Sequence, residues 1–251
     1  MKNILKYFKN LLTKNKVPTL TIVGVGPGDA SFLTLGALRA IKEARYIFFP
    51  VSSFDKKSYA ADIVKKYIRF KKKIPIIFPM AREEFNPDQI WEFAAQKIIA
   101  CIKKKNSAVL LCLGDPSLFA SSSYILRKIH DLEPQIIIKK MAGISSISAA
   151  AAYSNYDLVK HGETLKILEC PNDSNQLISL LKKANSNKNV LAILKIGKRW
   201  LWVKDILKKE GLINQTLLAS NVGMFNQIID SAGKYTSDNL PYFSLLIIRF
   251  N

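Results

Sequence analysis

The fold class follows from the stretch TLTIVGVGPGD, residues 19–29. Its first part, 19–25, is rich in β-branched and apolar residues and predicts a strand, and the glycines and proline that follow predict a tight loop. Apolar residues over 32–41 then recur at helical spacing, and 44–49 returns to strand character. This β-α-β start predicts an α/β fold with a largely parallel sheet.

The same alternation continues along the chain. In the first half, we expect helices at 57–70, 87–104 and 121–129 and strands at 74–78, 108–113 and 136–138, followed by a small-residue helix at 145–153. In the second half, we expect strands at 166–168, 190–195, 217–220 and 243–249 and helices at 176–184 and 202–210. The pattern therefore predicts two α/β domains, 18–156 and 157–251, after a separate leader, 1–17.

Composition excludes a disordered protein but does not decide whether the positive charge serves a binding partner. The chain has 251 residues, 49% apolar and 23% charged, which is typical of a globular protein rather than a disordered one. Its 38 basic and 19 acidic residues give a net charge of +19. Such a charge suits nucleic acid, anionic lipid or an acidic ligand. Because 31 of the basic residues are Lys and only seven are Arg, an AT-rich genome explains it equally well.

The cysteines and histidines predict neither disulfides nor a metal centre. Cys101, Cys112 and Cys170 show no C-x-x-C spacing, which favours a reducing compartment, the cytoplasm. His130 and His161 have no partner at metal-binding spacing. No apolar run approaches the roughly 18 residues that a membrane-spanning helix needs.

Residues 1–17 form a basic leader with five lysines and no acidic residue. Apolar Ile4, Leu5, Phe8, Leu11 and Leu12 recur at helical spacing, which predicts a short amphipathic helix. Such a helix binds a membrane surface or acts as a targeting segment. The alternative is a loosely attached leader, or a helix that lies against its own protein.

Three strand-to-loop turns are candidates for a ligand site. The first, 24–29, lacks a dinucleotide fingerprint, since Asp29 stands where the third glycine is required and would repel a phosphate. Asp115 follows a buried strand, so it either contacts a ligand or caps the helix after it. In the third turn, 142–146, the hydroxyls of Ser145 and Ser146 have the same two possible roles.

In this order and spacing the motifs resemble those of the tetrapyrrole methylases, over about residues 19–250. The resemblance rests on 24–29 with 33–35, on 113–116, and on 142–146 with its alanine-rich helix. Within the family, the chain is most similar to the branch that methylates C(20) of precorrin-2 in cobalamin synthesis. The segments that carry this closer similarity are 78–80, 162–163, 194–198 and 242–246.

The resemblance implies an S-adenosylmethionine-dependent C-methyltransferase that binds its methyl donor between two α/β domains and forms a homodimer. It implies a tetrapyrrole substrate, with or without cobalt, and no nucleic-acid partner. The residues that it assigns to the cofactor are Pro27, Leu113, Gly114, Asp115, Leu118, Ser145, Ser146, Ile196 and Val222. It assigns no metal ligand, and it leaves the general base unidentified.

The chain departs from the family pattern at three positions. Ala142 stands in place of a common Pro and Ser145 in place of Thr, and neither change removes the turn. Val51 stands where a basic residue is common, which puts in doubt one contact to a substrate carboxylate. Two other functions stay open at this point: methylation of ribosomal RNA by the same fold, and a non-catalytic binding protein that keeps the fold.

Overall fold

The computed structural model describes residues 18–53, 55–78, 86–103 and 107–250. They form two compact units, of which the first ends at Ile144 and the second begins at Ser145. This division differs from the expected junction after residue 156, because the helix at 146–153 groups with the second unit. The predicted leader, 1–17, lies outside the described residues.

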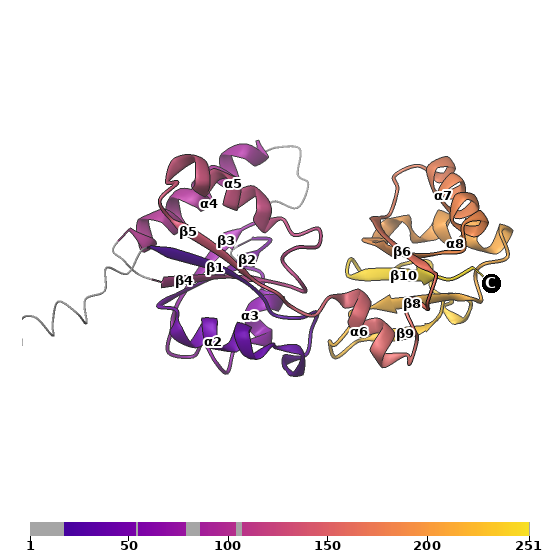
Figure 1. Ribbon diagram of the computed structural model, residues 1–251, viewed down its shortest axis with the longest axis horizontal. Helices are drawn as coiled ribbons and strands as arrows, with labels where there is room; N and C mark the ends of the chain where they lie inside the picture. The colour runs from indigo at the N-terminus through magenta and orange to yellow at the C-terminus, as the bar shows by residue number, and fades with distance from the viewer. Residues whose placement is uncertain (1–17, 54, 79–85, 104–106, 251) are drawn as a thin grey trace, which may run out of the picture. The chain divides into compact units, whose positions relative to one another are not determined.

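The first unit is built on a five-stranded, fully parallel sheet with the order β3-β2-β4-β1-β5, which confirms the predicted parallel sheet (Figure 1). Its strands are β1 (Thr19–Gly24), β2 (Tyr46–Val51), β3 (Lys72–Ile77), β4 (Ser107–Cys112) and β5 (Ile137–Met141). Four α-helices alternate with them: α2 (Leu35–Glu43), α3 (Tyr59–Ile63), α4 (Pro87–Ile102) and α5 (Ser122–Leu132). Strand β1 lies between β4 and β5, so the three loops singled out in the sequence follow three neighbouring strands.

Strand alternation places apolar side chains on both faces of this sheet. On one face, Ile22 and Leu110 are fully buried beneath α4 and α5. On the other, Val23 and Leu111 are buried beneath α2 and α3. Figure 1 shows the two pairs of helices on opposite sides of the sheet. Burial on both faces is typical of parallel sheets and explains the near-continuous apolar strands in the sequence.

The helix predicted over 57–70 is wrong in its extent, because α3 ends at Ile63. From there the backbone continues in tighter turns, in which Lys65 N donates to Asp62 O at 3.3 Å and Tyr67 N donates to Val64 O at 2.8 Å. These three-residue turns still bury Val64 and Ile68. The apolar spacing that suggested a helix is therefore satisfied by a turn.

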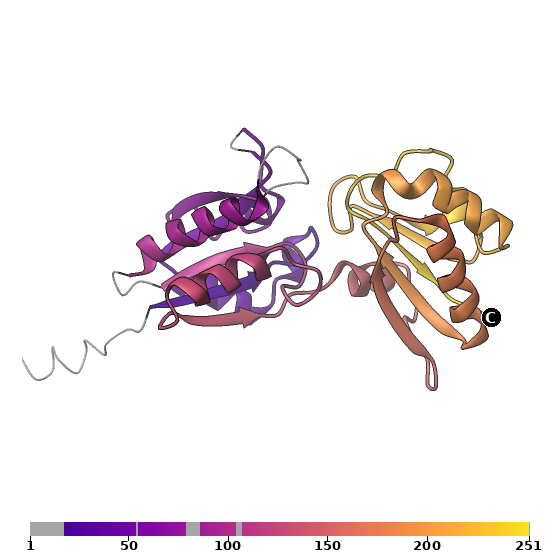
Figure 2. The same cartoon turned by 90° about the horizontal axis from the view of Figure 1, so that it is seen from above.

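The second unit holds a mixed five-stranded sheet with the order β6-β7-β10-β8-β9. Its strands are β6 (Thr164–Glu169), β7 (Asn189–Leu194), β8 (Thr216–Ser220), β9 (Ile228–Ser231) and β10 (Ser244–Ile248), and its α-helices are α6 (Ser146–Tyr153), α7 (Ser174–Ser186) and α8 (Trp200–Lys209). Helices α7 and α8 contact each other and lie side by side in Figure 2. The sequence analysis missed β9, a four-residue strand with an exposed Asp230 and no apolar alternation.

Strand directions bring the ends of β7 and β8 to one edge of the second sheet. Both strands run antiparallel to β10, which lies between them. Their carboxyl ends therefore flank the start of β10 at Ser244. The core beside them includes Trp200, which is fully buried and donates from Nε1 to Ser237 O at 2.9 Å. Trp200 is thus a core residue rather than a platform for stacking a ligand.

Candidate functional site

In the first unit, the site begins with the loops that follow β1 and β4. Val25 N donates to Cys112 O at 2.9 Å, so the two strands stay paired for one residue beyond their ends. Gly26 and Gly114 then form an antiparallel bridge, with Gly114 N donating to Gly26 O at 2.8 Å. Both glycines have positive φ, +79° and +71°, a conformation that side-chain-bearing residues rarely adopt. The glycines are needed here because the backbone turns sharply between two paired loops.

Gly24, Gly114 and Gly143 meet through backbone atoms, and the contact leaves no room for a side chain on Gly24 or Gly143. A Cβ atom on Gly24 would lie 2.6 Å from Gly143 N and 2.7 Å from Gly114 O. A Cβ atom on Gly143 would lie 2.2 Å from Gly114 O. The loops after β1, β4 and β5 therefore touch through bare backbone, and the two close contacts involve atoms that cannot rotate away.

Space remains open on the other side of this contact. A Cβ atom built on Gly114 would meet no described atom within 4 Å. A ligand can therefore approach the backbone of the β4 loop closely at this glycine.

Thr34 forms hydrogen bonds to two elements of the first unit. Its hydroxyl accepts from Ala37 N at 3.1 Å and donates to Ala142 O at 3.4 Å. The motif residue Thr34 thus caps α2 and joins it to the β5 loop.

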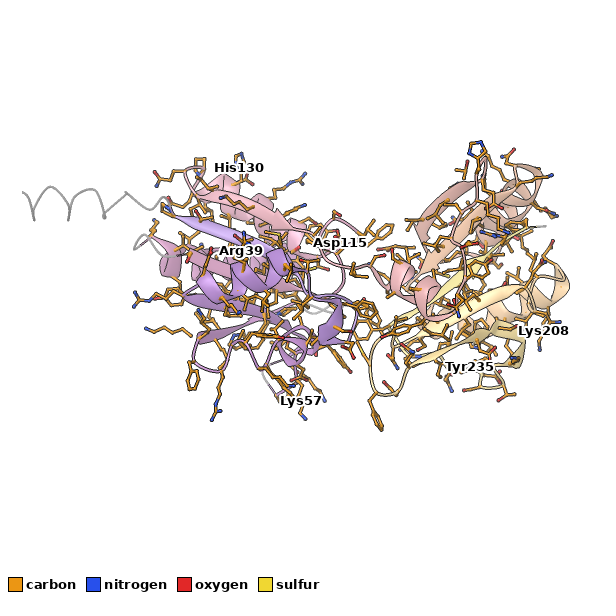
Figure 3. The ribbon with its side chains drawn as sticks, turned by 60° about the horizontal axis from the view of Figure 1, so that its bottom comes forward. Arg39, Lys57, Asp115, His130, Lys208 and Tyr235 are labelled. Carbon is orange, nitrogen blue, oxygen red and sulfur yellow. The ribbon has the colours of Figure 1, made fainter. Side chains whose placement is uncertain are left out.

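Asp115, which is labelled in Figure 3, joins the β4 loop to the β5 loop. Its Oδ2 accepts from Gly143 N at 2.9 Å, and its Oδ1 accepts from Ser117 N at 2.7 Å and from the Ser117 hydroxyl. The alternative role considered from the sequence, a cap on the next helix, is wrong: α5 begins after Ser121, and no side chain caps it. Asp115 instead holds together the loops that follow β4 and β5, the two strands on either side of β1.

The pKa of Asp115 lies below its ordinary value. Partial burial raises this pKa, but the donors on Ser117 and Gly143, together with the positive charge of Lys140, lower it by more. Asp115 is therefore a carboxylate at neutral pH. This fixed anion lies beside Gly114, where the backbone is open.

We expect the Asp115→Asn variant to lose about 1 kcal/mol of unfolding free energy at pH 7, because the amide replaces one acceptor with a donor that faces an N–H group. The folded-state pKa of Asp115 is lowered, so its contribution is present above the unfolded pKa of about 3.9 and is lost as pH falls through the folded pKa. Urea denaturation of the native protein and the variant, at pH 7 and at pH 3, measures the difference in their unfolding free energies. A difference that is the same at both pH values would contradict the role assigned to the carboxylate.

The other predicted cofactor residues of the first unit lie along the same loops. Pro27 is buried, Leu113 is half-buried, and Leu118 is 37% exposed. Asp29 caps the 3-10 turn η1 (Ala30–Phe32) by accepting from Ser31 N at 2.6 Å, as its place before the turn predicts. Val51 is buried at the end of β2, so this position presents no cation.

In the second unit, the predicted residues lie at two places. Ser145 caps α6 by accepting from Ser148 N at 3.1 Å, which confirms the capping role, and Ser146 is the first residue of that helix. Ile196 and Val222 follow β7 and β8 at the shared edge of the sheet. Ile196 is 0% exposed and Val222 is 4% exposed, so both residues are buried at this edge.

The edge that carries Ile196 and Val222 has unusual backbone. Lys195 and Asn221, each directly after a strand, have φ of +59° and +49°. Asn221 N donates to Phe243 O at 2.9 Å, and Ile196 N donates to Ser244 O at 3.4 Å. Left-handed residues other than glycine are strained, and such residues cluster at active sites and ligand clamps. Lys195 lies in the segment 194–198 that carries the family similarity, but the sequence analysis did not predict left-handed backbone at Lys195 or Asn221, because neither is glycine.

The thiols and histidines offer no reactive group in the described part of the chain. Burial raises the pKa of Cys112 to about 12 and that of Cys170 to about 11, so both are neutral thiols at pH 7. His130 and His161 are exposed. Among the described residues, no group of three or more His, Cys, Asp or Glu side chains is placed to hold a metal ion. The arrangement suits binding and alignment of reactants rather than covalent catalysis.

The glycine contact and the two loops fixed by Asp115 coincide with a known family pattern. Residues 19–232 match the model of the Tetrapyrrole (Corrin/Porphyrin) Methylases. The chain belongs to the tetrapyrrole methylase family. Membership confirms the expected fold, the methyltransferase activity and S-adenosylmethionine as the methyl donor.

Two relatives within this family are similar along much of the chain. The probable cobalt-precorrin-2 C(20)-methyltransferase of Methanocaldococcus jannaschii is 34% identical over 177 residues, which cover 68% of this chain and 75% of that protein. The cobalt-precorrin-2 C(20)-methyltransferase of Salmonella typhimurium is 23% identical over 92% of this chain and 95% of its own length. Both of these tetrapyrrole methylases carry the same activity in their names.

Solved structures agree on the fold of this tetrapyrrole methylase. Cobalt precorrin-4 methyltransferase superposes with a TM-score of 0.71 at 15% identity, covering 95% of this chain and 98% of that one. A uroporphyrin-III C-methyltransferase from Thermus thermophilus, solved with S-adenosylhomocysteine, superposes with a TM-score of 0.63 at 18% identity and covers 92% of this chain and 97% of that one. At these identities the comparison concerns the fold alone.

Proposed function

We propose that this tetrapyrrole methylase transfers a methyl group from S-adenosylmethionine to C(20) of precorrin-2 or cobalt-precorrin-2. The similarity to two C(20)-methyltransferases, one of them 34% identical, is the observation that carries this choice of substrate. Other members of the family methylate different tetrapyrroles, so the fold alone does not identify the ring position.

The cofactor residues that we propose are Pro27, Leu113, Gly114, Asp115 and Leu118 in the first unit and Ser145, Ser146, Ile196 and Val222 in the second. Two observations within the first unit support them. The backbone is open beside Gly114, and a fixed carboxylate adjoins it at Asp115. Adenosine and a methionine tail carry no phosphate, so backbone groups and one carboxylate suit them better than a phosphate-binding loop would.

The chemistry requires alignment more than it requires an enzyme nucleophile. An electron-rich ring carbon attacks the sulfonium methyl group, the carbon–sulfur bond breaks, and S-adenosylhomocysteine leaves with the electron pair. The newly methylated ring carbon then loses its proton to solvent or to a carboxylate of the substrate. Holding two reactants in line accounts for a large part of such a rate enhancement. The neutral thiols of Cys112 and Cys170 agree with a direct transfer.

Label transfer tests the substrate class. The purified chain is incubated with S-adenosylmethionine labelled in its methyl group and with precorrin-2, cobalt-precorrin-2 or ribosomal RNA as the acceptor. We expect label in one or both pigments and none in the RNA, whose contacts with a chain of net charge +19 are electrostatic and weaken steeply with salt. Label in RNA and in neither pigment would overturn the proposal.

We also propose that the chain acts in the cytoplasm as a homodimer. Its cysteines support the reducing compartment, since Cys112 and Cys170 are free thiols. No helix in the described part of the chain is long and apolar enough to cross a membrane. Sedimentation equilibrium of the purified protein tests the oligomeric state, and a mass of one chain at micromolar concentration would contradict the dimer.

A further inference from the structure

Basic residues gather at the edge of the first sheet where its strands begin. Strands β2 and β3 start side by side, with Tyr46 opposite Lys72, and Arg45 N donates to Ser107 O at the start of β4, at 3.0 Å. The segments 42–46 and 62–73 meet at this edge and contain eight basic and two acidic residues. We call their exposed cations, together with Phe70, the basic edge: Lys42, Arg45, Lys65, Lys66, Arg69, Phe70, Lys72 and Lys73; Glu43, Asp62 and Tyr67 are exposed on the same segments.

The side chain of Lys71 holds the two segments of the basic edge together. Its Nζ donates to Ala44 O at 2.9 Å and also to Lys42 O, at the end of α2. This contact explains the presence of Lys71, because the helix dipole stabilises a cation at the carboxyl end of α2. It does not account for the others: among the described residues, Lys65, Lys66, Arg69 and Lys73 form no ion pair. Four unpaired cations on one short segment repel one another unless an anionic partner is near.

An aromatic side chain projects from the middle of these cations. Phe70 is 91% exposed, and the Arg69 guanidinium lies 5.3 Å from the centre of its ring. Tyr67, one turn earlier, is 37% exposed. A single exposed apolar residue is ordinary, but an exposed aromatic ring on a segment of unpaired cations suits a surface that meets lipid headgroups and inserts the ring among them.

A second basic and apolar element joins the chain at the same edge. Pro18 precedes β1, whose first residue, Thr19, pairs with Ser107 at the start of β4. Residues 1–17 therefore join the first unit at this edge, and their sequence combines five lysines with apolar residues at helical spacing. The apolar side of such a helix can be buried in the hydrocarbon region of a bilayer, whereas a nucleic acid offers it no comparable apolar surface.

We propose that the basic edge docks on an anionic membrane surface. The candidate methylation site lies at the carboxyl ends of the strands and the basic edge at their starts, so the six residues of β1 separate the two by about 20 Å. Docking therefore leaves the loops after β1, β4 and β5 facing away from the lipid. This inference concerns where the enzyme resides and does not depend on which tetrapyrrole it methylates.

Co-sedimentation with vesicles tests the proposal on the full chain. We expect binding to phosphatidylcholine vesicles that contain about one third phosphatidylglycerol, no binding to pure phosphatidylcholine, and release as salt rises. The combined variant Lys65→Gln, Lys66→Gln, Arg69→Gln and Lys73→Gln should lower the partition coefficient by at least about tenfold. Phe70→Ser should lower it about threefold without loss of thermal stability, because that ring is exposed.

A matched variant separates the basic edge from net charge. Lys166→Gln, Lys182→Gln, Lys183→Gln and Lys208→Gln removes four exposed lysines of the second unit, of which Lys208 is labelled in Figure 3. It should bind vesicles like the native chain. Equal weakening in both variants would show that net charge alone drives binding and would overturn the proposal.

Three further outcomes also contradict it. Binding of the native chain to transfer RNA that is lost in the combined variant, together with no binding to anionic vesicles, would assign the edge to nucleic acid. Absence of vesicle binding by the native chain overturns the proposal directly. Loss of all vesicle binding on deletion of 1–17, with the combined variant still binding like the native chain, would assign membrane contact to the leader instead.

Discussion

The Gly143→Ala variant is expected to lose about 3 kcal/mol or more of unfolding free energy, the upper end of the range for overpacked cores. Its new methyl group would lie 2.2 Å from Gly114 O and 2.8 Å from Gly24 Cα. Both of those atoms belong to backbone, so no side-chain rotation relieves the contact. The three loops must separate, and the variant should also lose measurable binding of S-adenosylmethionine. Urea denaturation and calorimetry measure the two effects.

Gly36→Ala is the matched control for this substitution. A Cβ atom on Gly36 would also be close to a neighbour, Met141 Sδ at 2.7 Å, but that neighbour is the flexible end of a side chain. Gly36 lies within α2, where alanine favours the helix by about 1 kcal/mol. We therefore expect the stability of this variant to lie within about 1 kcal/mol of the native value. A stable Gly143→Ala protein that binds the cofactor normally would contradict the description of the glycine contact.

The Gly114→Ala variant is expected to bind S-adenosylmethionine about a hundredfold more weakly, a change of about 2.8 kcal/mol. Its methyl group would enter the space beside the β4 loop, which is open in the described structure and which we assign to the cofactor. The positive φ of +71° adds a stability cost of about 1–2 kcal/mol for any side chain. The substitution thus combines a backbone effect with a local steric effect.

Gly211→Ala separates these two effects. Gly211 has φ of +70° and the same open surroundings, but it lies after α8 in the second unit. Its substitution should cause a similar loss of stability with no change in cofactor affinity. If both variants bind S-adenosylmethionine like the native protein, the space beside Gly114 is not part of the cofactor site.

The sequence was sufficient for most of the first unit, for a physical reason. Its central strands β1 and β4 are buried on both faces, so each appears as an apolar run followed by a loop that contains glycine, as in 19–29. Prediction of secondary structure from the apolar pattern failed for segments that are only partly buried. The segment 57–70 has helical apolar spacing but forms turns after Ile63, and β9 has no apolar alternation.

The candidate site could be predicted only in part, because its key contacts join residues far apart in sequence. The position of Asp115 after a strand predicted a functional role, but its bond to Gly143 N depends on β1 lying between β4 and β5. The close contact between Gly24 and Gly143 depends on the same strand order. Left-handed backbone usually marks glycine and less often asparagine, so the residue type of Lys195 carries no signal for it and that of Asn221 only a weak one.

The position of the new methyl group tests the central claim most directly. The purified chain is incubated with cobalt-precorrin-2 and, separately, with metal-free precorrin-2, together with S-adenosylmethionine whose methyl carbon is carbon-13. The account predicts one new methyl resonance, coupled to C(20) of the ring, and one S-adenosylhomocysteine for each methyl group transferred. A methyl group on any other ring carbon, or no transfer to either ring by a chain that binds S-adenosylmethionine, would contradict it.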